Sequence, residues 1–104
     1  MLKTSVVYIC FNRPSITKKT FEKIRSQKPK KLFLIMDGPR LGNKKDIKNC
    51  KQVKKIICKI DWKCKVYKNF SINNLGLKKR VISGLNWVFE KVDKAIILED
   101  DCYP

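Results

Sequence analysis

The sequence predicts an α/β fold in which a mostly parallel sheet is flanked by helices. Four short apolar runs, each of strand length, alternate along the 104-residue chain with three segments whose apolar residues recur at helical spacing. Strands and helices that alternate as βαβαβαβ form parallel sheets through right-handed crossovers. The chain is long enough for one domain, so we expect residues 1–104 to form a single unit.

The first half of the chain supplies two of the predicted strands. Residues 6–11 are continuously apolar and rich in β-branched side chains, which is typical of a strand covered on both faces. Pro14 suits the first turn of the helix that follows, and this helix extends to about Gln27. The second apolar run, residues 32–36, ends at the turn signature Asp37-Gly38-Pro39.

The second half contains two predicted helices and two more strands. Residues 46–57 have a helical apolar spacing, and a weaker, alternating strand follows around residues 64–68. The clearest helical stripe comes next and consists of Leu77, Val81, Leu85, Val88, Phe89 and Val92. The last apolar run, residues 95–98, looks buried and leads into three acidic residues. This order is that of a Rossmann-like fold.

Polar residues follow three of the predicted strands and are expected to meet. Ligands of open α/β sheets collect outside the carboxyl ends of the strands, so these residues should share one edge. They are Asn12, Arg13, Asp37, Glu99, Asp100 and Asp101. Alternative interpretations exist for single members: Asn12 and Asp37 could be turn formers, and Arg13 an ordinary surface cation.

The acidic residues Glu99, Asp100 and Asp101 predict a bound cation. Neighbouring carboxylates repel one another, and no lysine lies next to these three. Carboxylate oxygens suit Mg²⁺ or Mn²⁺, which proteins commonly hold with one or two carboxylates and the phosphates of a substrate. In an extended segment Glu99 and Asp101 point to one side and Asp100 to the other.

Net charge, apolar run length and cysteine spacing bear on three further questions: binding to polyanions, location in the cell, and zinc or disulfide sites. The net charge of +16 comes mostly from lysines spread over residues 1–80, which is typical of a solvated surface; a basic surface that binds acidic lipid or a polyanion is the alternative. No apolar run is long enough to span a bilayer, and no signal peptide is recognised, so a cytoplasmic protein is expected. Five cysteines without paired spacing, and no histidine, predict free thiols without zinc or a disulfide.

Three segments resemble the N-terminal, nucleotide-binding half of GT-A nucleotide-diphospho-sugar glycosyltransferases, closest to the N-acetylglucosaminyltransferase I-like branch. The segments read VVYICFNRPSITKKTFEKI, LIMDGPR and NNLGLKKRVISGLNWVFEKVDKAIILEDDCYP. They cover most of the chain in the family's order. The last is the most specific, because an acidic motif of the DxD type follows a long helix and an apolar strand.

The resemblance implies a nucleotide-sugar donor, UDP-linked, and Mn²⁺ or Mg²⁺ as cofactor. Arg13 would contact the donor's diphosphate, Asp37 would hydrogen-bond the base, and Asp101 would ligate the metal. Glu99 and Asp100 would contact ribose or sugar hydroxyls and metal-bound water. The implied donor-binding set is Asn12, Arg13, Asp37, Glu99 and Asp100. Gly76 and Arg80, at the start of the long helix, are expected near the donor.

The resemblance also implies that the chain is a donor-binding fragment, truncated after the acidic metal motif. In this family the general base and the acceptor site come from later segments, so the catalytic residues and the glycan, lipid or protein acceptor stay unassigned. Two alternatives remain. A sugar-nucleotide nucleotidyltransferase would leave its first strand through a Gly-rich phosphate loop, whereas Asn12-Arg13-Pro14 stands here. A basic module for nucleic acid or for the inner face of an anionic membrane would explain the charge and leave the three acids without a role; specific nucleic-acid binding is not expected.

Overall fold

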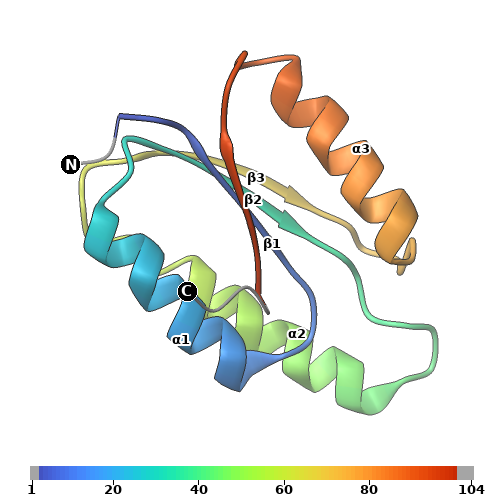
Figure 1. The fold of residues 1–104 in the computed structure, drawn as a ribbon. Coiled ribbons are helices and arrows are strands. Elements are labelled where there is room, and N and C mark those ends of the chain that lie inside the picture. The colour runs from blue at the N-terminus through green and yellow to red at the C-terminus, as the bar shows by residue number, and fades with distance from the viewer. Residues whose placement is uncertain (1–2, 101–104) are drawn as a thin grey trace.

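The computed structural model describes residues 3–100, which adopt the predicted α/β fold (Figure 1). The elements are β1 (Val6–Cys10), α1 (Pro14–Gln27), β2 (Lys31–Met36), α2 (Lys44–Ile57), β3 (Lys65–Phe70), α3 (Leu77–Phe89) and β4 (Ile96–Glu99). This confirms the βαβαβαβ order. The observed bounds differ from the expected ones by up to three residues, the largest difference being α3, which ends at Phe89 and not at Val92.

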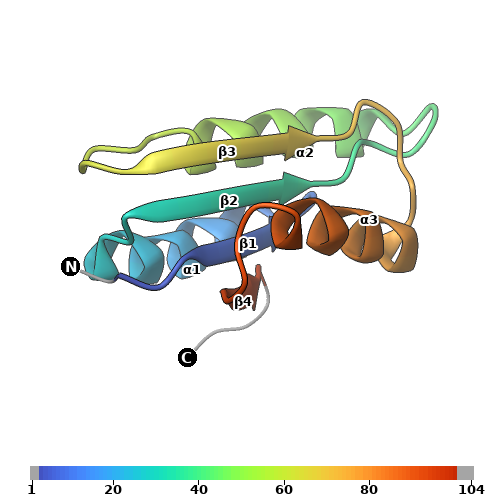
Figure 2. The ribbon, with the colours of Figure 1, turned by 90° about the horizontal axis from the view of Figure 1, so that it is seen from above.

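In the described residues, the sheet is four-stranded and wholly parallel, in the order β3-β2-β1-β4. Val6 of β1 lies opposite Leu32 on one side and Ile96 on the other, so the strands begin at a common level. Helices α1 and α2 cover one face of the sheet and α3 covers the other (Figures 1 and 2). The carboxyl ends of the parallel strands therefore point the same way, as a shared site requires.

Alternate residues of the two central strands serve two hydrophobic layers. Tyr8 and Leu34 pack toward α1 and α2 together with Phe21, whereas Val7 and Phe33 belong to the α3 side. All five of these side chains are buried. Because both faces of β1 and β2 are covered, their sequences are continuously apolar rather than alternating, as predicted for the first strand.

The expectation that the fourth apolar run is buried is wrong. Ile96 and Ile97 are 40% and 43% exposed, although they resemble β1 in composition. The reason is the position of β4, which is an edge strand that pairs with β1 alone among the described strands. At the opposite edge β3 presents exposed Lys65 and Lys68, charged side chains of the kind that protect sheet edges.

The structure also bears on the predicted free thiols and on membrane-spanning segments. Cys10, Cys50, Cys58 and Cys64 are free thiols, while Cys102 lies outside the described residues. Among residues 3–100, no helix is both long enough and apolar enough to cross a membrane.

Candidate functional site

A cavity of about 580 Å³ lies at the carboxyl ends of the strands. Its wall is built from the residues after β1, β2 and β4 and from the first turns of α3. Five of the predicted site residues line it, namely Asn12, Arg13, Asp37, Glu99 and Asp100. Gly76 and Arg80 line it too, together with Arg40 and Asn74. The sixth predicted residue, Asp101, lies outside the described residues. The expected convergence is thus found for every site residue that the structure describes.

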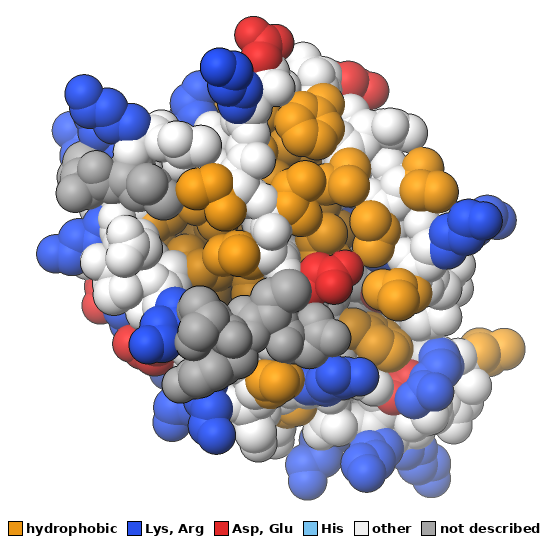
Figure 3. All heavy atoms as spheres, viewed as in Figure 1, with side chains coloured by type: hydrophobic (Ala, Val, Ile, Leu, Met, Phe, Trp, Pro, Cys, Tyr) orange, Lys and Arg blue, Asp and Glu red, His pale blue; other side chains and the backbone are white. Residues whose placement is uncertain are grey.

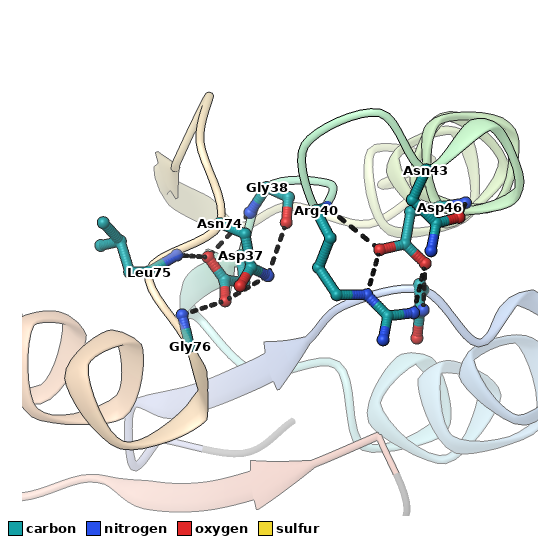
Figure 4. Close-up of polar contacts among 9 residues, drawn as sticks. Asp37, Gly38, Arg40, Asn43, Asp46, Asn74, Leu75 and Gly76 are labelled. Atoms are coloured by element: carbon teal, nitrogen blue, oxygen red, sulfur yellow. Dashed lines mark hydrogen bonds and ion pairs between the residues drawn. The ribbon is translucent and has the colours of Figure 1, made fainter.

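Asp37 is buried, and four donors from the protein satisfy its carboxylate (Figure 4). Oδ1 accepts hydrogen bonds from the backbone amides of Gly38 and Leu75, both at 2.9 Å. Oδ2 accepts from the Asn74 side-chain amide and the Gly76 backbone amide, both at 3.1 Å. A carboxylate offers about four acceptor directions, so all of them are used internally. Asp37 thereby fixes the loop before α3 and places a negative charge at the N-terminus of that helix.

Two glycines permit this arrangement of loops. A Cβ atom at Gly38 would lie 2.5 Å from the backbone oxygen of Ile72, so only glycine lets the two loops approach this closely. Gly76 has a φ of +85°, in the region that L side chains rarely adopt, and it is the N-cap residue directly before α3. The segments on either side of Asp37 are therefore shaped for contact with each other.

Asp46, which the sequence analysis did not select, is a second buried carboxylate at this end of the sheet (Figure 4). Its Oδ2 accepts from the backbone amide and Nε of Arg40, at 3.0 and 2.6 Å. Its Oδ1 accepts from Nη2 of Arg40 and from Nδ2 of Asn12, both at 2.8 Å. These hydrogen bonds, above all those from the Arg40 guanidinium, hold the pKa of Asp46 well below its usual range.

The Asp46 cluster also explains the place of Asn12. The side-chain amide of Asn12 donates across to α2, so it joins the β1–α1 turn to the start of that helix. The N-cap of α2 is Asn43, whose side chain accepts from the Asp46 backbone amide at 2.9 Å. The spacing Asn43-x-x-Asp46 resembles a capping box and was the signal available in the sequence. The Arg40 pairing has no comparable sequence signature.

Arg80 is a buried cation that ties α3 to the ends of two strands. Its Nε donates to the carbonyl of Met36 at 3.2 Å. Its Nη2 donates to the backbone oxygen and Oδ1 of Asn69, at 2.6 and 2.7 Å. Burial lowers the pKa of Arg80, although arginine keeps its charge at any physiological pH. Arg80 therefore lines the cavity as a fixed positive charge, held by carbonyl oxygens.

Arg13 and Glu99 differ from the residues above. Among residues 3–100, neither side chain has a hydrogen-bond or ion-pair partner. Arg13 is exposed and Glu99 is half-buried, and both line the cavity. Their charged groups are accordingly available to a molecule that enters it.

Cys10 lies in the cavity wall but has the wrong chemistry for a nucleophile. The side chain is buried, and burial, followed by the charge of nearby Asp100, raises the pKa of its thiol well above the usual value. A thiol with a raised pKa stays protonated and unreactive near neutral pH. Cys10 is consequently a small core residue.

In the described part of the chain, no three Asp, Glu, Cys or His side chains are grouped so as to hold a metal ion. Asp101, the predicted ligand, is not among those residues. Glu99 and Asp100 do supply two carboxylates at the cavity wall. That donor set fits Mg²⁺ or Mn²⁺, which commonly bind one or two carboxylates and complete their coordination with water and substrate phosphates.

Comparisons of this chain with protein-family models, with curated proteins and with solved structures each give no significant match. The function is therefore inferred from the cavity and from the residues that line it.

Proposed function

We propose that this chain binds a nucleotide-diphospho-sugar, UDP-linked, together with Mn²⁺ or Mg²⁺, as the donor-binding part of a GT-A glycosyltransferase of the N-acetylglucosaminyltransferase I-like type. One observation carries the proposal: residues predicted from three separate strand ends line a single cavity of about 580 Å³. Cavities of small-molecule ligands range from about 300 to 1,000 Å³. The cavity of this chain lies outside the carboxyl ends of parallel strands, which is where α/β proteins bind nucleotides.

The side chains at the carboxyl ends of β1 and β4 contact different parts of the donor in this proposal. Arg13 is the cation for the diphosphate, since a guanidinium forms strong, bidentate hydrogen bonds to phosphate oxygens. Glu99 accepts hydrogen bonds from ribose or sugar hydroxyls. Glu99, Asp100 and Asp101 together provide the carboxylates for the metal. The bound ion would supply positive charge that offsets the repulsion between these carboxylates and the diphosphate.

The internally bonded residues have positioning roles in this proposal. Because Asp37 already accepts four hydrogen bonds, its contribution to the base site is the loop that it holds, from Asn74 to Gly76. Asn12 in the same way holds the β1–α1 turn and so the backbone from which Arg13 projects. The described residues thus have roles in donor binding, and none of them is assigned as the general base.

Isothermal calorimetry with UDP and UDP-sugars tests the proposal. Binding should require Mn²⁺ or Mg²⁺ and should vanish when a chelator is in excess. Arg13→Ala should weaken binding by about 1–3 kcal/mol, the scale of a lost charged hydrogen bond, without changing metal binding. Asp101→Asn should weaken it by a similar amount and should also weaken metal binding.

Lys30→Ala is the matched control, because it removes one exposed positive charge from the opposite end of the sheet. Tight UDP binding in excess chelator would overturn the proposal. So would an Arg13→Ala variant that binds as well as the Lys30→Ala control.

A further inference from the structure

Four large aliphatic side chains are exposed in the β2–α2 and β3–α3 connections and at the start of α3, at the carboxyl end of the sheet. Leu41, in the β2–α2 connection, is fully exposed, and Ile72, in the β3–α3 connection, is 87% exposed. Leu75 and Leu77, at the start of α3, are 42% and 74% exposed. We call these four residues the apolar rim. Single exposed aliphatic residues are ordinary, but a group at one end of a protein marks an interaction surface.

The two connections that carry the apolar rim are held together. The Asn74 side chain donates to the Gly38 carbonyl at 2.9 Å, and the backbone of Ile72 packs directly against Gly38. Asp37 adds the hydrogen bond to the amide of Leu75. Figures 1 and 2 agree that these connections lie side by side, next to the first turns of α2 and α3. The apolar rim therefore belongs to one bonded surface and not to two independent loops.

Positive charge surrounds the apolar rim. Lys44 and Lys45 begin α2, and Lys78 and Lys79 lie in the first turn of α3; all four are exposed. Within residues 38–48 and 71–80 the single acidic residue is Asp46, which is buried and paired with Arg40. The exposed charges of these two segments are therefore all positive. In Figure 3 basic side chains gather at the lower right, on the side where the two connections lie in Figure 1.

Two segments at the opposite end of the sheet, residues 28–31 and 59–65, are basic but lack the aliphatic component. Lys30 and Lys31, at the start of β2, are exposed, as are Lys59 and Lys63 before β3. None of the large exposed hydrophobic residues falls in the segments 28–31 and 59–65. Ile96, which is 40% exposed, also lies at this end, but it begins β4, and β1 separates β4 from β2. The lysines of segments 28–31 and 59–65 thus have no exposed leucine or isoleucine in their own segments, whereas the lysines of α2 and α3 lie in the same segments as the apolar rim.

We propose that this end of the molecule docks on an anionic lipid bilayer. The apolar rim would enter the interface between headgroups and acyl chains, while the lysines of α2 and α3 contact lipid phosphates. Nucleic acid is the other common partner of basic surfaces, but its single strands stack on aromatic side chains. Residues 38–48 and 71–80 contain no Phe, Tyr or Trp, so the surface favours lipid. Leu77 also lines the cavity, so docking would place the cavity mouth near the membrane surface.

Co-sedimentation with vesicles tests the docking surface. The chain should bind vesicles that contain phosphatidylglycerol and should not bind vesicles of phosphatidylcholine alone. Leu41→Ser with Ile72→Ser should lower the partition coefficient at least about tenfold through loss of insertion, and the exposed positions ensure that folding is unaffected. Lys78→Ala with Lys79→Ala should lower it by a similar factor.

The control is the double variant Lys30→Ala with Lys31→Ala. It removes the same charge from the opposite end of the sheet, away from the apolar rim. We expect it to change the partition coefficient less than about threefold. Equal losses from the two lysine pairs would show unspecific attraction and overturn the proposal. Unchanged vesicle binding by the Leu41 and Ile72 double variant would overturn it as well. A third contrary result is tighter binding to an oligonucleotide than to vesicles, because it would assign the basic surface to nucleic acid.

Discussion

The two halves of the cavity use their charged residues in opposite ways. On the β2 side, Asp37 and Arg80 line the cavity and Asp46 holds Arg40 in its wall; all three are buried, and each makes several hydrogen bonds to the protein. On the side of β1 and β4, Arg13 and Glu99 line the same cavity but have no hydrogen-bond or ion-pair partner among residues 3–100. The comparison separates residues that shape the cavity from residues that are free to bind what enters it.

Burial is the physical reason for this division. An unpaired charge that is removed from water costs several kcal/mol, so the buried carboxylates and the buried guanidinium must find partners inside the protein. Arg13 keeps its hydration because it is exposed, and Glu99 keeps part of it. Substitutions in the first half should therefore act on stability, and those in the second half on binding.

The largest effect is expected at Asp37. Asp37→Ala would leave the amides of Gly38, Leu75 and Gly76 without their acceptor, and it would remove the charge at the N-terminus of α3. We expect the free energy of unfolding in urea to fall by about 3 kcal/mol. Asp93→Ala, at an exposed position, is the control and should change it by less than about 0.5 kcal/mol. If the two variants were equally stable, Asp37 would not be the anchor of the loop.

A smaller effect, and one that depends on pH, is expected at Asp46. Its pKa is lowered in the folded protein, so the stabilisation is fully present above the unfolded value of about 3.9 and is lost as the pH falls further. Asp46→Asn should be less stable than the wild type at pH 7, with the difference shrinking toward pH 2. The loss at pH 7 should be below that of Asp37→Ala, because the Arg40 side chain is 58% exposed and solvent screens the pair.

Thermal unfolding followed by circular dichroism from pH 7 to pH 2 would measure this difference. Asp61→Asn is a suitable control, because Asp61 is exposed and its ion pair with Arg25 lies at the other end of the sheet. A constant difference between wild type and Asp46→Asn across this range would contradict the assigned role of the ion pair.

The smallest change in stability is expected at Glu99. Glu99→Gln removes a carboxylate that has no described partner, so unfolding in urea should change by less than about 0.5 kcal/mol. Binding of a UDP-sugar in the presence of Mn²⁺ should nevertheless weaken about tenfold in calorimetry, because a charged ligand for hydroxyls or metal is lost. A variant that is destabilised as much as Asp37→Ala would erase the distinction between the two halves.

The amino-acid sequence by itself was enough to predict the fold and the convergence of polar residues at the carboxyl ends of the strands. Apolar runs such as residues 6–11 and 32–36 identify strands that are covered on both faces, and helical spacing identifies the crossovers between them. These patterns are local and recur along the chain, so they can be recognised in the sequence without knowledge of tertiary contacts. Parallel strands then bring their carboxyl ends together, which is why Asn12, Arg13, Asp37, Glu99 and Asp100 were predicted to converge.

The tertiary structure alone decided which of these residues remain available to a ligand. The partners of Asp37 lie as far along the chain as Gly76, and Asn12 meets Asp46 across 34 positions. Such hydrogen bonds form only when two loops that are distant in the sequence lie next to each other. No local sequence pattern predicts that distance between the loops. The exposure of Ile97 has a similar origin: an apolar run reads the same at the centre and at the edge of a sheet, and only the strand order places β4 at the edge.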